Sequence, residues 1–596
     1  MGTRSQIALL VALTLAIYLG SAFTPALFDD ADSVHAEAAR EILTRGDWVT
    51  LHANGVRYLE KAPLLFWSMA AAFQLLGMRE MAARLPLVLG ALAFTLALYG
   101  LGRFIFGARA GFYAGLGGAT CFGVYLFTRI LIPEILLALF ITLAHWCFLG
   151  AQVASLARRA RGRGEGYPLG GMHAALLYYG MYLSMALAVL TKGLIGVILP
   201  TAVIGLYLLL TGQVRPRLFL ELRVLPGALL FLAAAAPWHV LAGLRNEKFF
   251  WFYFMNEHFL RYLGQRVPPD YDTVPLLLFW GLHLVWLFPW TPFFVLAFRD
   301  FPRTLGPRFD RERILLFLWL WVGVVIAFFS FSTRQEYYTF PAYPALILLG
   351  AHALAEGELF PGQALQKAHW ALVAVGALAA AGLGAMVVLS RGIMVEGDIA
   401  GLLTRNPPSY ALSLGHILDL TPLSFAALRA PALGAGLTLL WGSWVALRLR
   451  MRRRHLAAGV ALALMAALFF FWTHAALNVF SPYLSSKILA RAIVAEAGRG
   501  DRIVINGEYE SGSTLNFYAG RQVYILNGRT ANLWFGSFYP DAPRIFLEDR
   551  DLVRLWPAPG RVFLFTEAEQ VPRLVMLIGP ARVLAHSGGK VVLVNR

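Results

Sequence analysis

Long apolar runs dominate the pattern of hydrophobic and polar positions along this chain. Because about 20 apolar residues in a helix cross the roughly 30 Å of hydrocarbon in a bilayer, each long run is a candidate membrane span. There are thirteen such runs, at 7–27, 86–102, 111–127, 135–157, 172–190, 194–214, 224–244, 273–298, 314–333, 337–355, 369–390, 430–447 and 456–478. As bounded here, none of them contains Asp, Glu, Lys or Arg. The pattern predicts an all-α polytopic membrane protein with about thirteen transmembrane helices in residues 1–479.

After the last run the pattern changes to short segments. Residues 484–497 have helical spacing, and strand-like stretches follow at 502–505, 523–526, 562–565 and 591–594, with Gly and Asp between them. We therefore predict a small α/β domain at 480–596. Both cysteines, Cys121 and Cys147, fall inside apolar runs, so no disulfide framework is expected to support this domain.

The distribution of charge predicts the orientation. The 596 residues are 58% hydrophobic and 14% charged, with a formal net charge of +17. Threading the runs back and forth brings basic residues of short loops to one side, among them Arg158, Arg159, Arg161, Arg163, Arg303, Arg308, Arg452, Arg453 and Arg454. The positive-inside rule makes that side, and the N-terminus, cytoplasmic. The external side then receives the C-terminal domain and the loops at 28–82, 245–272 and 332–340. The net charge is explained by topology, so no nucleic-acid partner is expected.

The first external loop concentrates acidic residues. Residues 33–45 have apolar positions at four-residue spacing and are followed by Gly46, which predicts a helix lying in the membrane interface. Asp29, Asp30 and Asp32 stand at its start. Capping of the helix explains Asp32 taken alone equally well. Three carboxylates beside a bilayer are costly, however, and together they indicate a functional site.

A cation lies close to these acids in the sequence. A second helix is predicted to start at Pro63, because proline is favoured in a first helical turn. Lys61 comes just before it, where the helix N-terminus attracts anions. With arginines from other loops, Lys61 can bind a phosphate at membrane depth. A lysine that snorkels to lipid headgroups is the alternative for any single one of these cations.

Glu134 and the spacing of Asp30 and Asp32 are two further candidates for catalysis or metal binding. Glu134 opens the fourth run a few residues after the third ends, so a short hairpin holds it, although pairing with Arg129 explains it as well. Asp30 and Asp32 have the D-x-D spacing that binds a divalent ion against a diphosphate, and Glu60 or His258 could add ligands. A donor with one phosphate can be neutralised by Lys and Arg alone. A bound metal therefore stays open, and no cofactor is expected to be required.

An ordered series of short motifs resembles one family over about the first 350 residues. The motifs are Asp29-Asp30, His35 to Glu41, Gly46-Asp47-Trp48, Asn54 to Tyr58, Glu60 to Pro63, Arg129 to Glu134, Thr191-Lys192-Gly193, Pro237-Trp238, Arg245-Asn246, Asn256-Glu257-His258 with Arg261, and Ser330 to Tyr343. They are similar to the bacterial dolichyl-phosphate-mannose-protein-mannosyltransferase-like glycosyltransferases, most of all to the lipid A aminoarabinose transferase branch. That branch usually reads Asp-Glu-Thr-Arg-Tyr-Ala-Glu at the stretch from Asp30 to Glu37. The acid is shifted in this chain, which leaves open whether Asp30 or Asp32 acts.

The resemblance implies a GT-C fold whose active site lies at the periplasmic face of the bacterial inner membrane. It implies inverting transfer of 4-amino-4-deoxy-L-arabinose from undecaprenyl phosphate to a lipid A phosphate, with membrane lipids as surroundings. Asp30 or Asp32 would orient or deprotonate the acceptor, helped by Glu134. The implied donor-phosphate ligands are Lys61, Arg266, Lys192, Arg245 and Tyr58, and the substrate-positioning residues are His35, Arg57, Glu60, Asn256, Tyr337 and Tyr338.

Two alternatives compete with this interpretation. One is a related polyprenyl-phosphate-sugar transferase that acts on a protein or another glycolipid. The other is a lipid or solute transporter, which is weaker because the runs carry no charges and no matching interrupted helices appear in two halves.

Overall fold

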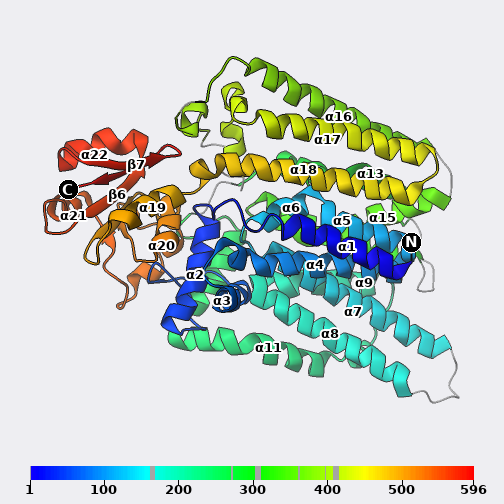
Figure 1. Cartoon of the computed structure of the whole chain (residues 1–596). Helices are drawn as coiled ribbons and strands as arrows, with labels where there is room; N and C mark the ends of the chain where they lie inside the picture. Colours follow the sequence, from blue (N-terminus) through cyan, green and yellow to red (C-terminus); the bar gives the residue numbers. More distant parts are fainter. Residues whose placement is uncertain are drawn as a thin grey trace.

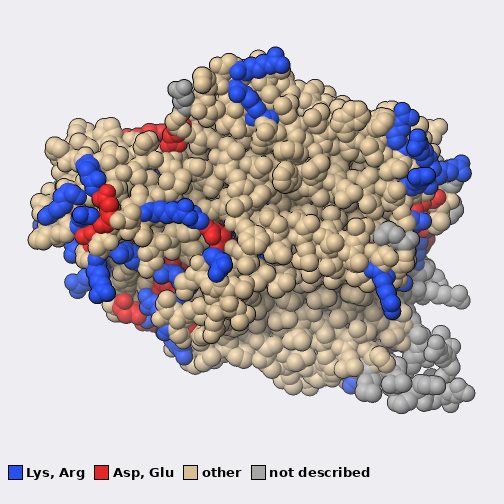
Figure 2. All heavy atoms as spheres, in the orientation of Figure 1, with Lys and Arg blue, Asp and Glu red and all other residues tan. Residues whose placement is uncertain are grey.

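The computed structural model describes residues 2–160, 168–269, 273–302, 311–359, 363–395, 397–406, 412 and 415–596. Most of its helices run alongside one another as a bundle, and a smaller domain that contains the C-terminus lies at one end (Figure 1). Figure 2 shows Lys and Arg over this domain and at the far end of the bundle, with few charged residues between them. Four basic residues of the topology argument and the end of the predicted 245–272 loop lie outside the described residues: Arg161, Arg163, Arg303, Arg308 and 270–272.

Each of the thirteen predicted runs coincides with a helix or a bent helix pair. In the described part of the chain, eight helices are long and apolar enough to cross a membrane: α4 (Glu80–Phe106), α7 (Glu134–Ala160), α8 (Pro168–Lys192), α11 (Val224–Arg245), α14 (Arg311–Ser330), α16 (Gln363–Leu389), α17 (Arg429–Met451) and α18 (His455–Leu484). Two runs form pairs bent by 41° and 110°, namely α5 (Ala108–Thr120) with α6 (Phe122–Arg129) and α12 (Leu276–Trp286) with α13 (Thr291–Ala297). The last three are shorter: α1 (Thr3–Tyr18), α9 (Ile195–Leu210) and α15 (Tyr343–Leu359).

Short segments connect these helices. They comprise α10 (Leu218–Glu221), a π-helix, η1 (Trp251–Leu260), and 3-10 turns η2 (Phe298–Asp300), η3 (Glu336–Ala342), η4 (Ile399–Leu402), η6 (Gly415–Asp419) and η7 (Pro422–Ala426). The turns η4, η6 and η7 lie between α16 and α17, and buried Asp419 ties this segment to α18 by accepting a hydrogen bond from the Tyr483 hydroxyl at 3.0 Å. A cavity at this end of the bundle is lined in part by His416, Ile417 and Leu420 of this segment.

The first external loop forms a layer across one end of the bundle. Helix α2 (Ala31–Arg45) crosses the direction of the bundle helices (Figure 1) and ends at Gly46, whose φ of 67° suits a residue without a side chain. Its apolar stripe is buried, and its two expected ion pairs join Glu37 to Arg40 and Glu41 to Arg45. A short hairpin of β1 (His52–Ala53) and β2 (Val56–Arg57) leads to α3 (Leu64–Leu76), which starts right after Pro63. Both predicted helices of the loop are therefore present.

The C-terminal domain is α/β, as predicted. Its six-stranded sheet has the order β5-β4-β3-β6-β8-β7, with parallel pairs around β3 and antiparallel pairs on both sides of β8. The strands are β3 (Arg502–Asn506), β4 (Tyr524–Leu526), β5 (Phe546–Leu547), β6 (Val562–Glu567), β7 (Arg582–Ser587) and β8 (Lys590–Val594). Helices α19 (Lys487–Glu496), α20 (Ser513–Ala519), α21 (Asp549–Leu555) and α22 (Val571–Ile578) and the 3-10 turns η8 (Tyr509–Gly512), η9 (Ala531–Leu533), η10 (Gly536–Phe538) and η11 (Ala568–Gln570) complete it. Since α18 continues to Leu484, the domain starts slightly later than the predicted residue 480.

Asp29 fixes the domain to the first external loop. Its carboxylate accepts hydrogen bonds from the Thr514 amide at 2.9 Å and the Ser486 hydroxyl at 2.7 Å, and it pairs with Lys590 at 2.7 Å. Asn54 adds two hydrogen bonds to the backbone of Val523, at 2.8 and 2.9 Å. One of the three acids at the start of α2 therefore serves domain docking.

Candidate active site

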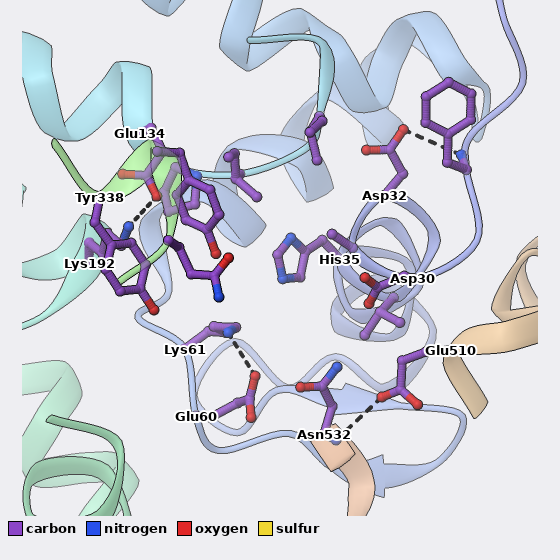
Figure 3. Close-up of a pocket in the computed structure, with 18 of the residues that line it drawn as sticks. Asp30, Asp32, His35, Glu60, Lys61, Glu134, Lys192, Tyr338, Glu510 and Asn532 are labelled. Atoms are coloured by element: carbon purple, nitrogen blue, oxygen red, sulfur yellow. Dashed lines mark hydrogen bonds and ion pairs between the residues drawn. The ribbon is translucent and has the colours of Figure 1, made fainter. Parts of the chain in front are cut away.

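A cavity of about 840 Å³ lies where the end of the bundle, the first external loop and the C-terminal domain meet. Figure 3 shows side chains from segments far apart in the sequence converging on it. The predicted site residues that line it are Asp30, Asp32, His35, Tyr58, Glu60, Lys61, Glu134, Lys192, His258, Tyr337 and Tyr338. Four others, Arg57, Arg245, Asn256 and Arg266, are not among its lining residues.

The two candidate aspartates point in different directions. The Asp30 side chain lies beside the cavity, whereas the Asp32 carboxylate is turned toward the backbone in front of α2 (Figure 3). Asp32 is 1% exposed, and its Oδ1 accepts the amide of Leu131 at 2.8 Å. Its Oδ2 lies 3.6 Å from Nη2 of the buried Arg84. Asp32 therefore links α2 to the hairpin before α7, and Asp30 is the better placed to meet a substrate.

The backbone of Asp30 has an unusual conformation. It is the N-cap residue of α2, with φ 71° and ψ −129°, and its side chain makes no capping hydrogen bond. Its amide donates to the Glu510 carbonyl and to the Ser513 hydroxyl, both at 3.0 Å. A residue other than glycine in such a region costs about 1–3 kcal/mol and persists where its surroundings fix it. The C-terminal domain supplies those surroundings.

Lys61 belongs to a chain of alternating charges. Its ammonium lies 2.7 Å from Oε1 of Glu60, which also accepts the Tyr58 hydroxyl at 3.2 Å. Burial alone would raise the pKa of Glu60, but Lys61, Arg266 and Arg261 outweigh it and lower that pKa to about 2. Glu60 is therefore an anion that holds the cations beside it in place. The side chain of Lys61 remains 30% exposed in the cavity wall.

Arg266 and Asn256 lie behind this chain of charges. Arg266 bonds to Glu60 at 2.8 Å and to both oxygens of Glu257 at 2.9 and 3.0 Å, and its side chain is 5% exposed. Asn256 is fully buried and donates to Glu257 at 2.9 Å. Neither residue meets the cavity. The structure instead brings Arg261, which was not among the predicted phosphate ligands, into the wall at 3.2 Å from Glu257.

Arg245 and Arg57 form contacts outside the cavity. Arg245 is more than half exposed and pairs with Asp47 at 3.1 Å, outside the cavity. Arg57 pairs with Asp541 of the C-terminal domain at 2.7 Å and stacks over the Tyr539 ring at 4.3 Å. This placement argues against a direct role of either residue in substrate binding, because their guanidinium groups are committed to other partners.

Glu134 forms an ion pair with Lys192, and its expected alternative partner Arg129 is directed elsewhere. Lys192, the last residue of α8, pairs with Oε1 of Glu134 at the start of α7 (Figure 3). The Lys192 ammonium lies 5.1 and 4.9 Å from the ring centres of Tyr337 and Tyr338. Glu134 is 1% exposed, and its Oε2 has no hydrogen-bond partner in the described residues. That oxygen can accept a hydrogen bond from a ligand.

The imidazole of His35 extends toward the cavity. Its Nδ1 lies 2.6 Å from the Leu131 carbonyl, so Nδ1 carries the proton and Nε2 is the acceptor. Burial, reinforced by Lys61, lowers the pKa of His35 to about 4. His35 is therefore neutral near pH 7 and can orient a donor group of a substrate.

The predicted metal ligands do not converge. Within the described residues, no group of three or more His, Cys, Asp and Glu is arranged to hold a metal ion. Both ring nitrogens of His258 are engaged, Nδ1 with the Tyr253 carbonyl at 2.6 Å and Nε2 with the Leu194 amide at 3.2 Å. Asp30 and Asp32 diverge as described above. These donors therefore do not fit a metal site.

The sequence prediction named no site residue in the C-terminal domain. Glu508, Glu510, Asn532 and Lys590 line the cavity, and Glu510 is 7% exposed. Burial, and then the charge of Asp30, raise the pKa of Glu510 to about 8. One signal could have pointed here: Glu508 and Glu510 follow the carboxyl end of β3, a position where parallel sheets commonly bind ligands.

Comparison with known proteins gives a consistent result. A family model described as dolichyl-phosphate-mannose-protein mannosyltransferase matches residues 60–158. The crystal structure of ArnT from Cupriavidus metallidurans bound to undecaprenyl phosphate superposes with a TM-score of 0.81 at 23% identity, over 100% of this chain and 99% of that one. The fold is that of ArnT. The predicted GT-C architecture is thereby confirmed for this polytopic membrane protein.

Proteins with similar sequences include named aminoarabinose transferases. Undecaprenyl phosphate-alpha-4-amino-4-deoxy-L-arabinose arabinosyl transferase of Erwinia tasmaniensis is 26% identical over 578 residues, 92% of this chain and 91% of the relative. Transferase 1 of the same name from Proteus mirabilis is 27% identical over 342 residues. That alignment spans 57% of the Proteus protein and 56% of this chain. The resemblance inferred from the motifs is confirmed by these similarities.

Proposed function

We propose that this ArnT-like chain is an inverting glycosyltransferase that moves 4-amino-4-deoxy-L-arabinose from undecaprenyl phosphate to a phosphate of lipid A. The observation that carries the proposal is one cavity that holds the carboxylate of Asp30 together with the cations Lys61 and Arg261. A sugar transfer between phosphates needs both groups: a base beside the acceptor and positive charge beside the phosphate that leaves. The names of the relatives support the sugar and its carrier.

The donor phosphate fits the cations of the cavity. Lys61 and Arg261 reach the wall with their carboxylate partners, Glu60 and Glu257, behind or beside them. These carboxylates fix the direction of the cations before a substrate arrives, which reduces the cost of ordering them. Lys192 provides a third positive charge, held between two tyrosine rings. Charge-assisted hydrogen bonds from such groups are the strong interactions for a phosphate.

The polyprenyl chain has an apolar path out of the cavity. Ile198 of α9 and Phe259 of η1 line the cavity and are also 43% and 57% exposed on the surface of the bundle. The cavity therefore reaches an apolar surface, as a site fed from the membrane requires. This opening favours a lipid-linked substrate over a peptide groove.

The transfer step needs few groups. An oxygen of the acceptor phosphate bonds to the anomeric carbon from the face opposite the leaving oxygen. The bond between that carbon and the undecaprenyl phosphate oxygen breaks, and its electron pair leaves with the phosphate. Asp30 takes the proton if the acceptor phosphate carries one, and releases it to water afterwards. Lys61 and Arg261 stabilise the charge that grows on the leaving phosphate, while Glu134 and neutral His35 can orient sugar hydroxyl or amino groups.

The proposed location is the bacterial inner membrane, with this cavity on the periplasmic side. The support comes from the basic loops at the opposite end of the bundle, where Lys and Arg gather (Figure 2) and Arg452, Arg453 and Arg454 join α17 to α18. The positive-inside rule places such loops in the cytoplasm.

A direct assay tests the proposal. Purified full-length protein in liposomes receives undecaprenyl phosphate-linked aminoarabinose and lipid A, and mass spectrometry measures the mass gain of lipid A. We expect transfer by the native chain and loss of transfer by Lys61→Ala. Arg245→Ala is the matched cation control and should keep activity within about threefold, because its surface ion pair contributes little. Unmodified lipid A with the native chain would refute the proposed acceptor, and transfer to added peptide would favour the protein-directed alternative.

A further inference from the structure

The turn η8 of the C-terminal domain lies directly beside Asp30. The carbonyl of Glu510 in this turn accepts the Asp30 amide at 3.0 Å, and Ser513 at the start of α20 accepts it through its hydroxyl. The same hydroxyl lies 2.6 Å from that of Ser33 in α2. The backbone of the proposed base is therefore held from the other end of the chain.

The Glu510 side chain belongs to the same place. It lines the cavity and is labelled next to Asp30 in Figure 3. Its Oε1 accepts the amide of Asn532 in η9 at 3.3 Å, which fixes the direction of the carboxyl group. The titratable groups that face it are Asp30 and Tyr58 from the first loop and Glu508 and Tyr509 from its own turn. Burial and the neighbouring acids Asp30 and Glu508 disfavour a negative charge on Glu510, although Lys61 and Lys590 line the same cavity.

We propose that Glu510 is a positioning residue of the transfer reaction, which acts on Asp30 from the C-terminal domain. As a neutral carboxyl it lies beside the Asp30 carboxylate without repelling it, and it keeps that carboxylate turned toward the acceptor. When Glu510 ionises, it adds negative charge where an anionic acceptor phosphate must approach. The inference rests on the proposed function and goes beyond it, because it makes the C-terminal domain part of the active site.

The test compares Glu510→Gln and Glu510→Ala with the native chain in the liposome assay. The Gln amide keeps the shape and the neutral state, so we expect kcat within about threefold of native at pH 7. Ala removes the side chain that directs Asp30, and kcat should fall about tenfold while the KM for the donor stays within about twofold, since Lys61 and Arg261 are untouched. Glu496→Gln is the control carboxyl, at the outer surface of the same domain. A merely structural role would lower kcat equally for Gln and Ala and lower the melting temperature with it.

The pH profile gives a second readout. Because the pKa of Glu510 is about 8, roughly a tenth of it stays neutral at pH 9 by simple titration. The ratio of Glu510→Gln to native activity should therefore rise about tenfold between pH 7 and pH 9. Both proteins meet the same substrates, so the ratio cancels substrate titration. A flat ratio, or unchanged kcat in Glu510→Ala, would overturn the inference.

A measurement without substrate separates the two proposals. Infrared difference spectra of the purified full chain should show a protonated carboxyl band that disappears near pH 8 and is missing in Glu510→Gln. Asp30→Asn removes the neighbouring charge and should move that midpoint to lower pH. If the native chain transfers no sugar but the midpoint moves, the proposed function fails and the coupling of Glu510 to Asp30 stands. If the midpoint does not move in Asp30→Asn, the coupling fails whatever the assay shows.

Discussion

Two walls of the cavity are built in different ways. The cationic wall consists of Lys61, Arg261 and Lys192, each beside a carboxylate, and it comes from loops and helix ends within the transmembrane part. The acidic wall consists of Asp30 and Glu510, which come from the first loop and from the C-terminal domain. Each cation of the cationic wall pairs with a carboxylate of the transmembrane part, whereas Asp30 of the acidic wall is held by Glu510 and Ser513 of the C-terminal domain. If the proposed function holds, the groups that would bind the phosphate come from the bundle, and the proposed base is positioned by residues from both ends of the chain.

Neutralising the acidic wall at Asp30 should have the largest effect on transfer. We expect Asp30→Asn to lower kcat by about 10³-fold, within the range for removal of a positioned base. Binding of undecaprenyl phosphate should change little, because the cationic wall is intact. The measurements are single-turnover transfer and an equilibrium binding assay with the carrier lipid. Loss of carrier binding together with transfer would show that the walls are not independent.

Removal of one cation should have the next largest effect. Lys61→Ala and Arg261→Ala should each lower kcat by about 10²-fold, because each removes a donor to the charge that develops on the leaving phosphate. Carrier binding should weaken in both, unlike in Asp30→Asn. Steady-state kinetics with binding data check this. If the Arg261→Ala protein behaves as native, Arg261 does not bind the phosphate, and Arg266 becomes the next candidate.

A substitution of Asp32 tests whether this residue has a structural role, in contrast to the proposed chemical role of Asp30. Asp32→Ala leaves Arg84, which is 1% exposed, without its nearby acid and removes the acceptor for the Leu131 amide. Breaking a buried ion pair costs about 3–5 kcal/mol, so we expect a clear drop of the melting temperature.

The transfer that remains at low temperature should exceed that of Asp30→Asn. Thermal unfolding followed by light scattering, with activity measured on the same preparation, checks both expectations. Equal inactivity of the two variants with native stability would mean that Asp32 takes part in the chemistry.

The last prediction is a small, pH-dependent change of the melting temperature caused by the ion pairs of Glu60. The pKa of Glu60 is lowered to about 2 from 4.5, so its ion pairs stabilise the fold above pH 4.5. That contribution is lost as the pH falls from there toward 2, because protonation removes the negative charge. The difference in melting temperature between native and Glu60→Gln should be constant from pH 7 to pH 5 and shrink below 4.5. A difference that does not depend on pH would contradict the charged state of Glu60.

The sequence predicted local structure well where a repeating pattern acts over neighbouring residues. The apolar stripe of α2 and the end at Gly46 follow from side-chain spacing within one helix, and both are present. The strands at β3, β4, β6 and β8 follow from short apolar runs. Strands β5 and β7 were missed, since the first has only two residues and the second has no buried position.

Site residues were harder to choose because neighbours in the sequence look alike. Arg261 and Arg266 lie in the same external loop, yet only Arg261 lines the cavity, while Arg266 is enclosed by Glu60 and Glu257. Arg245 belongs to one of the matched sequence motifs, but its side chain forms an ion pair with Asp47. Spacing alone does not reveal which partner a long side chain finds.

Local patterns along the chain were enough to predict the apolar runs, the helices of the first loop, the C-terminal α/β domain, and an acid and a lysine between the first two runs. These features depend on local periodicity and on the thickness of a bilayer. Tertiary contacts were needed to learn that the Asp32 carboxylate turns to Leu131 and Arg84 while the Asp30 side chain lies beside the cavity, with Glu510 next to it. The reason is that the direction of Asp32 is set by Leu131 and Arg84, and the conformation of Asp30 by Glu510 and Ser513. Such contacts join segments that no pattern along the chain connects.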